Sequence, residues 1–150
     1  MVRVTQSALI RRHAFLLALP LLGLLISSCG SSAQSLVLAK AAVDDFHSQL
    51  DTEQYATIYQ STDDGFRKIT NEPDFTKLLQ SVHRKLGNVQ EASTSGTGVA
   101  WFLGQGATVT LVYNTRFHDG TGTERFIYHV RDNHATLYGY RIFSNDLIEK

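Results

Sequence analysis

A chain of 150 residues with 14 basic and 14 acidic side chains carries no net charge and contains a single cysteine. That length suits one domain, and a lone cysteine excludes an intramolecular disulfide as a source of stability. The balanced charge argues against nucleic-acid binding, which favours a basic excess.

The first 28 residues have the organisation of an export signal. Arg3, Arg11 and Arg12 give the segment a positive start, and the 13 residues from 14 to 26 are apolar throughout, Gly23 and Pro20 included. An apolar core of this length fits a secretory signal and falls short of the roughly 18 to 20 residues that span a bilayer as a stable helix. We therefore predict that residues 1–28 are a cleaved signal peptide.

The cysteine comes directly after this segment. Ile26, Ser27, Ser28 and Cys29 resemble a bacterial lipobox, in which the cysteine is lipidated on its sulfur and becomes the new N-terminus. Lipidation also removes an unpaired thiol from an oxidising compartment. The resemblance implies palmitate at Cys29 and a protein of the cell envelope. Because Gly30 and not an aspartate follows, it implies the outer membrane, facing the periplasm, in a Gram-negative source. The alternative is a soluble periplasmic protein with an incidental cysteine.

The remaining chain divides into a short tether and one domain. Residues 29–35 are small and polar, which predicts a flexible tether behind the lipidated cysteine, and residues 36–150 form a single domain. Loss of the three signal arginines leaves 11 basic and 14 acidic side chains. This acidic balance again argues against a nucleic-acid partner.

The first half of the domain has helical periodicity. Apolar residues recur every three or four positions over residues 36–50, which predicts an amphipathic helix with Asp44, Asp45 and His47 on its polar side. Asp51 and Gln54 resemble a capping box that restarts the helix. A short helical turn with Phe66 and Ile69 covers a core edge, and a further helix runs from Pro73 to a stop at Gly87.

The second half has the period-two alternation of strands. Strands are predicted over residues 89–102, 108–117, 124–131 and 135–143, with Gly-rich reversals between the first three. Helices followed by an antiparallel meander predict an α+β domain, in which the helices pack on one face of a curved, cone-like four-stranded sheet.

Three motifs of this half resemble a known family. They are YNTRF at 113–117, ERF at 124–126 and LYGYRI at 137–142. Together with the order of elements over residues 36–144, they resemble the bacterial domain of unknown function 4019, which is similar to nuclear-transport-factor-2-like and cystatin-like cone folds. Such folds include isomerases, dehydratases and interaction modules, so the resemblance implies a fold more firmly than a function.

Few residues are candidates for chemistry, and we assign none as catalytic. His129 alternates with arginines on a strand, and His47 lies on a polar helix face, so both are poor candidates for a buried acid or base. Tyr113 and Tyr128 fall on the core face and are candidates for lining a pocket, although aromatics there more often serve packing. No Cys, His or carboxylate spacing indicates a metal site, and no motif indicates a cofactor.

The polar strand faces predict a different kind of site. If their side chains point to the same face of the sheet, a basic surface beside an aromatic ring would be formed by Trp101, Arg116, Arg125, Arg131 and Arg141. It would suit a protein partner, an anionic lipid or a carbohydrate, while the simpler reading is a solvated face on which arginine stems cover the sheet.

The sequence thus favours a non-catalytic binding module that is tethered to the bilayer by its N-terminal lipid and that contacts an envelope protein. The alternative is a small-molecule-binding or enzymatic cone, of the isomerase or dehydratase kind, with a small apolar ligand inside. An interior filled by Phe46, Leu79, Tyr113 and Phe126 would favour the first.

Overall fold

The computed structural model describes the backbone of residues 28–149 and the side chains of residues 32–148. The predicted signal peptide therefore lies outside the described residues except for Ser28, and so does the side chain of Cys29. The elements in chain order are α1 (Ser28–Asp51), α2 (Tyr55–Gln60), α3 (Asp64–Ile69), α4 (Glu72–Leu86), β1 (Val89–Phe102), β2 (Gly106–Phe117), β3 (Thr121–Arg131), β4 (His134–Phe143) and α5 (Asp146–Glu149).

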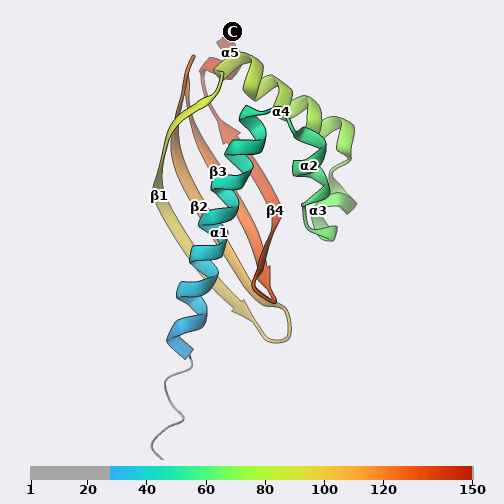
Figure 1. The fold of residues 1–150 in the computed structure, drawn as a ribbon, viewed down its shortest axis with the longest axis vertical. Coiled ribbons are helices and arrows are strands. Elements are labelled where there is room, and N and C mark those ends of the chain that lie inside the picture. Colours follow the sequence, from blue (N-terminus) through green and yellow to red (C-terminus); the bar gives the residue numbers. More distant parts are fainter. Residues whose placement is uncertain (1–27, 150) are drawn as a thin grey trace, which may run out of the picture.

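The four strands form one antiparallel sheet in the order β1-β2-β3-β4. Figure 1 shows α1 lying along one face of this curved sheet, with α4 crossing near the end of the molecule that also holds α5. α1 contacts all four strands, so it is the main cover of the inner face. The predicted α+β arrangement of helices on a four-stranded antiparallel sheet is confirmed.

Alternation along β2 separates the two faces of the sheet as predicted. Side chains that point toward the helices are buried: Val109, Leu111, Tyr113, Thr115 and Phe117. Intervening residues point to the outer face and are partly or fully exposed. A one-residue slip would exchange the two sets, so burial of one face fixes the register of the hairpins.

The first helix begins earlier than its apolar pattern predicts. α1 starts at Ser28, whereas the periodicity placed the start of the domain near Leu36, so residues 29–35 have helical backbone where we predicted a flexible tether. Ser35 is buried on the same stripe as Ala39 and Val43. This position extends the contact of the helix with the sheet by one turn.

The predicted capping box at residues 51–54 is wrong. α1 continues to Asp51, and α2 begins after Gln54 with no side-chain cap. The Asp51 carboxylate instead accepts a hydrogen bond at 2.9 Å from the backbone N–H of Val89. Asp51 therefore ties the end of α1 to the start of β1.

The other helix ends follow ordinary rules. Asp63 caps α3 by accepting from the Gly65 N–H, Asn71 caps α4, and Pro73 lies in the first turn of α4. Gly87 ends α4 with a positive φ of 75°, as predicted. Ile69 does not cover a core edge: it lies at the end of α3 and is 78% exposed.

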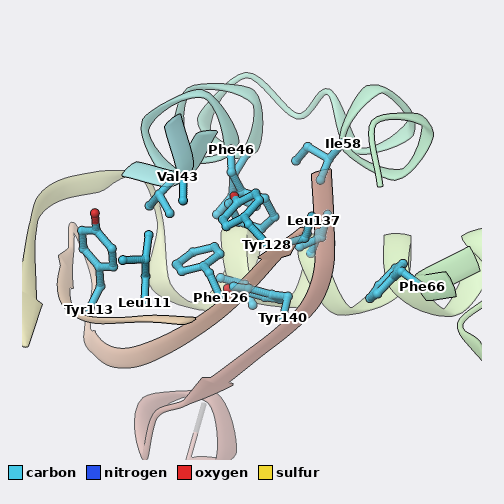
Figure 2. Close-up of a cluster of buried hydrophobic side chains, with 14 of the residues drawn as sticks. Val43, Phe46, Ile58, Phe66, Leu111, Tyr113, Phe126, Tyr128, Leu137 and Tyr140 are labelled. Carbon is cyan, nitrogen blue, oxygen red and sulfur yellow. The ribbon is translucent and has the colours of Figure 1, made fainter. Parts of the chain in front are cut away.

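The space between helices and sheet is filled by side chains (Figure 2). Phe46 from α1 packs against Phe126 and Tyr140, with ring centroids 5.2 and 4.8 Å apart. Leu79 of α4 and Tyr113 of β2 are buried in the same cluster. The four residues whose packing inside the cone would favour a binding module are thus all buried.

Two glycines of the β1–β2 turn offer a matched test of how closely this turn approaches β3. Gly104 and Gly106 both have a positive φ, 74° and 81°, but a Cβ at Gly106 would lie 2.4 Å from the Val130 carbonyl oxygen, whereas none is within 4 Å at Gly104. Gly104→Ala should cost about 1 kcal/mol from backbone strain alone, and Gly106→Ala a further ~1 to 3 kcal/mol from the clash. Denaturant unfolding of both variants measures the difference; equal losses would contradict the close strand approach.

Candidate functional site

A carboxylate lies at the centre of the packed interior. Glu124 stands two residues before Phe126 on β3, so alternation turns its side chain toward the helices, and it is fully buried. A buried charge is expensive unless hydrogen bonds and partners replace its water. Its surroundings therefore decide whether Glu124 is a reactive group or a structural one.

Three side chains from three elements surround this carboxylate. The Tyr140 hydroxyl of β4 donates to Oε1 at 2.7 Å, and the Thr115 hydroxyl of β2 donates to Oε2 at 2.5 Å. His47 of α1 places its Nε2 2.8 Å from the same Oε2. We call Glu124, Thr115, Tyr140 and His47 the carboxylate cluster. It joins α1 to three strands, and both carboxylate oxygens are engaged.

The ionisation of Tyr140 fits this arrangement. Burial raises the pKa of Tyr140 well above its usual value, and the neighbouring Glu124 charge and hydrogen bond raise this pKa further. The phenol therefore stays protonated at neutral pH and remains a donor to Glu124. A phenol held in this way is a poor proton donor to a substrate.

The two predicted pocket tyrosines lie around the carboxylate cluster. Tyr128 is buried, and its hydroxyl donates to the Ala42 carbonyl of α1 at 3.1 Å. Burial, followed by the charges of Tyr113 and Glu124, raises the pKa of Tyr128. Tyr113 is buried with its ring edge-on to His47 and Phe126. The structure thus brings both tyrosines together with Glu124 inside the packed interior.

Two members of the carboxylate cluster correct the sequence analysis. His47, predicted on a polar helix face, is buried and faces the sheet. Glu124 was not predicted as a site residue at all, although its spacing from Phe126, Tyr128 and Val130 places it on the core face. An acidic residue in phase with a buried apolar set was the available signal.

The predicted basic surface is divided between the two faces of the sheet. Arg125 and Arg141 are cross-strand partners on the outer face. Arg116, on the same face, pairs with Glu91 at 3.0 Å. Trp101 pairs with the buried Ala107, so it faces the opposite side, where its Nε1 donates to Ser32 Oγ of α1. The structure does not bring Trp101 beside these arginines.

The fourth arginine lies at the β1–β2 turn. Arg131 is at the last position of β3 and donates from Nε to the Gln105 carbonyl at 2.7 Å. Arg125 and Arg131 are separated by six positions of an extended strand, which is about 20 Å. Arg125 and Arg141 therefore lie together on the outer face, while Arg116 lies four strand positions further along it, opposite Thr121.

A polar hollow of about 740 Å³ lies beside this region. Outer-face side chains of β2 and β3, including Asn114 and Thr123, line it together with Arg116, Phe143 and Asp146. Hydroxyl, amide and charged groups next to an exposed aromatic ring are suited to a polar ligand. The hollow contains no member of the carboxylate cluster other than Thr115, whose hydroxyl is turned to Glu124.

His129 contacts a second carboxylate on the outer face. Its Nδ1 lies 3.1 Å from Asp63 Oδ2, and its ring stacks on Tyr138 at 4.1 Å between centroids. Burial alone would raise the pKa of Asp63, but the hydrogen bonds from Gly65 and His129 and the charges of His129 and Arg131 together lower it. This contact ties the cap of α3 to β3.

Across residues 32–148, no group of three or more His, Cys, Asp or Glu side chains is placed to hold a metal ion. Within the part of the chain that the structure describes, no helix is long and apolar enough to cross a membrane. No protein-family model matches the sequence, and no significant match occurs among curated proteins.

Replacement of Glu124 by Leu tests the structural role of the carboxylate cluster. Glu124→Leu keeps most of the side-chain volume but leaves His47, Thr115 and Tyr140 without their acceptor, so it should cost about 3 to 5 kcal/mol in the free energy of unfolding. Glu91→Leu, which removes the exposed ion pair with Arg116, should cost less than about 1 kcal/mol. Similar losses in denaturant titrations would contradict the role given to Glu124.

The lowered pKa of Asp63 predicts a pH-dependent contribution to stability. Asparagine caps helices as well as aspartate, so Asp63→Asn removes mainly the charge. Wild type should exceed this variant by on the order of 1 kcal/mol above about pH 5, and the advantage should shrink as the pH falls below about 4, because the folded carboxylate titrates below its unfolded value. Asp64→Asn, at an 84% exposed neighbour, is the control. A constant difference from pH 7 to 2.5 would contradict the assignment.

Proposed function

We propose that this chain is a bacterial envelope lipoprotein of the domain of unknown function 4019 type, and that its α+β domain is a non-catalytic binding module. In this proposal residues 1–28 direct export, and lipidated Cys29 holds the domain at the membrane. In a Gram-negative cell the site is the periplasmic face of the outer membrane, as Gly30 implies.

The observation that carries the non-catalytic assignment is the state of Glu124. An acid or base must reach a substrate atom, directly or through one water. Glu124 is buried, and both of its oxygens are already engaged by Tyr140, Thr115 and His47. Phe46, Phe126 and Leu79 fill the space beside it. This arrangement supports a packed core in place of a reaction chamber.

The outer face of the sheet is the better candidate for binding. The cross-strand pair Arg125 and Arg141 and the polar hollow beside Arg116 both lie there. Guanidinium groups and hydroxyls suit a protein or glycan surface that offers carboxylates and hydroxyls. An envelope component of that chemistry is the partner that we propose.

Anchoring is tested with Cys29→Ser in cells labelled with palmitate. Wild type should incorporate the label and pellet with membranes, whereas the variant should lose the label and keep its signal segment, because a lipoprotein signal is removed only after lipidation of the cysteine. A variant of mature size that still labels and pellets would overturn the anchoring proposal.

One observation favours the alternative, a ligand-binding or enzymatic cone. An imidazole and a phenol each lie within hydrogen-bonding distance of one carboxylate in an apolar interior, a combination that general acid and base catalysis can use. Backbone amide shifts of Phe126 and Tyr140 in NMR titrations with small aromatic and cyclic-ketone fragments separate the two functions. Chemical shifts that do not change on titration support the binding module. Saturable changes that are lost in Glu124→Gln would establish a ligand-binding interior.

A further inference from the structure

The β1–β2 turn exposes three consecutive large apolar side chains. Trp101 is 50% exposed, Phe102 is 55% exposed and Leu103 is completely exposed. Val99, on the same strand end, is also partly exposed. We call Trp101, Phe102 and Leu103 the hairpin tip. They are consecutive in the sequence, with Trp101 and Phe102 on opposite faces of β1, and exposed apolar side chains gathered at one turn often mark a contact surface.

The hairpin that carries the tip has no charged residue of its own over a long stretch of sequence, although Arg131 of β3 lies beside the turn. No charged residue occurs between Glu91 and Arg116, so the β1–β2 hairpin is neutral along most of both strands. α1 is likewise neutral from its first residue to Lys40. A protein interface of ordinary composition has a polar, charged rim, whereas a surface that enters lipid must avoid charges that would lose their water.

The hairpin tip lies at the end of the molecule from which the membrane attachment would start. The Trp101 Nε1 donates to Ser32 Oγ at 2.9 Å, and Ser32 is three helical positions, about 5 Å along the axis, from Cys29. Figure 1 shows the start of α1 and the β1–β2 turn at the same end, with α4 and α5 at the other.

A cation also lies beside the hairpin tip. Arg131 donates to the Gln105 carbonyl within the same turn, which places its guanidinium next to the backbone of the turn. Tryptophan at the boundary between headgroups and acyl chains, with basic residues nearby, is a common pattern at membrane interfaces. The hairpin tip protrudes as a turn, so it suits insertion better than capture of a ligand in a groove.

We propose that the hairpin tip inserts into the interfacial region of the lipid bilayer and forms a second membrane contact beside the N-terminal anchor. This inference rests on the proposed membrane tethering, because three side chains bind a bilayer only weakly unless an anchor keeps them close to it. Two contacts at one end fix the orientation of the domain. The ends of α4 and α5 then face away from the membrane, and the strands of the sheet run away from the membrane surface.

Trp101 is the only tryptophan of the chain, so its fluorescence reports on the hairpin tip directly. The full lipidated chain is reconstituted into phosphatidylcholine and phosphatidylglycerol vesicles, with or without bromine on the upper acyl chain. Insertion predicts a blue-shifted emission, quenching by the brominated lipid, and at least threefold protection from aqueous iodide. Emission that stays unshifted, unquenched by bromine and open to iodide would overturn the inference.

The variant Phe102→Ser with Leu103→Ser tests whether the apolar side chains drive insertion. It should lose most of the bromine quenching, because each inserted side chain contributes roughly tenfold to partitioning. Ile69→Ser removes an apolar side chain on α3 that is 78% exposed, between the exposures of Phe102 and Leu103, and should behave as wild type. Quenching that persists in the double variant would overturn the inference, as would equal losses in the control.

Flotation of the same vesicles separates this inference from the proposed tether. Protein that floats with lipid while Trp101 stays open to iodide retains its anchor and contradicts insertion, which would leave a protein partner as the occupant of the hairpin tip. Lipidated protein that does not float contradicts the tether itself. Cys29→Ser, freed of its signal segment, should show reduced flotation but the same ranking of hairpin-tip variants.

Discussion

The buried carboxylate of Glu124 is the constraint on which the rest of the domain depends. A charge that is removed from water must be surrounded by donors, and here the donors come from α1, β2 and β4. His47 can reach Glu124 only if α1 lies along the inner face of the sheet, as it does. Apolar packing drives the helix onto the sheet, and the carboxylate cluster selects one position for it.

This constraint assigns different roles to the different parts of the molecule. The interior is occupied by aromatic rings (Figure 2) and by the carboxylate cluster, in which Glu124 engages its three partners. In the proposed function, recognition is therefore left to the surfaces. The outer sheet face carries Arg125, Arg141 and a polar hollow. Exposed apolar side chains lie instead at the β1–β2 turn. A domain with one apolar end and one polar face suits the proposed function at a membrane surface.

Local patterns were sufficient for most of the fold. Alternation in β2 identified its buried face, and Pro73 and Gly87 marked the limits of α4 because each has a conformational reason to be there. Residues 29–35 were not predicted as helix, since serine and glycine favour it weakly and only contact with the sheet compensates. The face of Trp101 could not be counted along β1, because register irregularities near Glu91 and Gly96 interrupt the alternation.

The central claim is that the carboxylate cluster holds α1 to the sheet, and a double-mutant cycle between His47 and Glu124 tests it most directly. The free energy of unfolding is measured for wild type, His47→Leu, Glu124→Gln and the combined variant. We predict a coupling energy of about 1 to 3 kcal/mol, because the second substitution removes an interaction that the first has already broken. Additive losses, with a coupling energy near zero, would contradict the claim and would leave Glu124 free for another role.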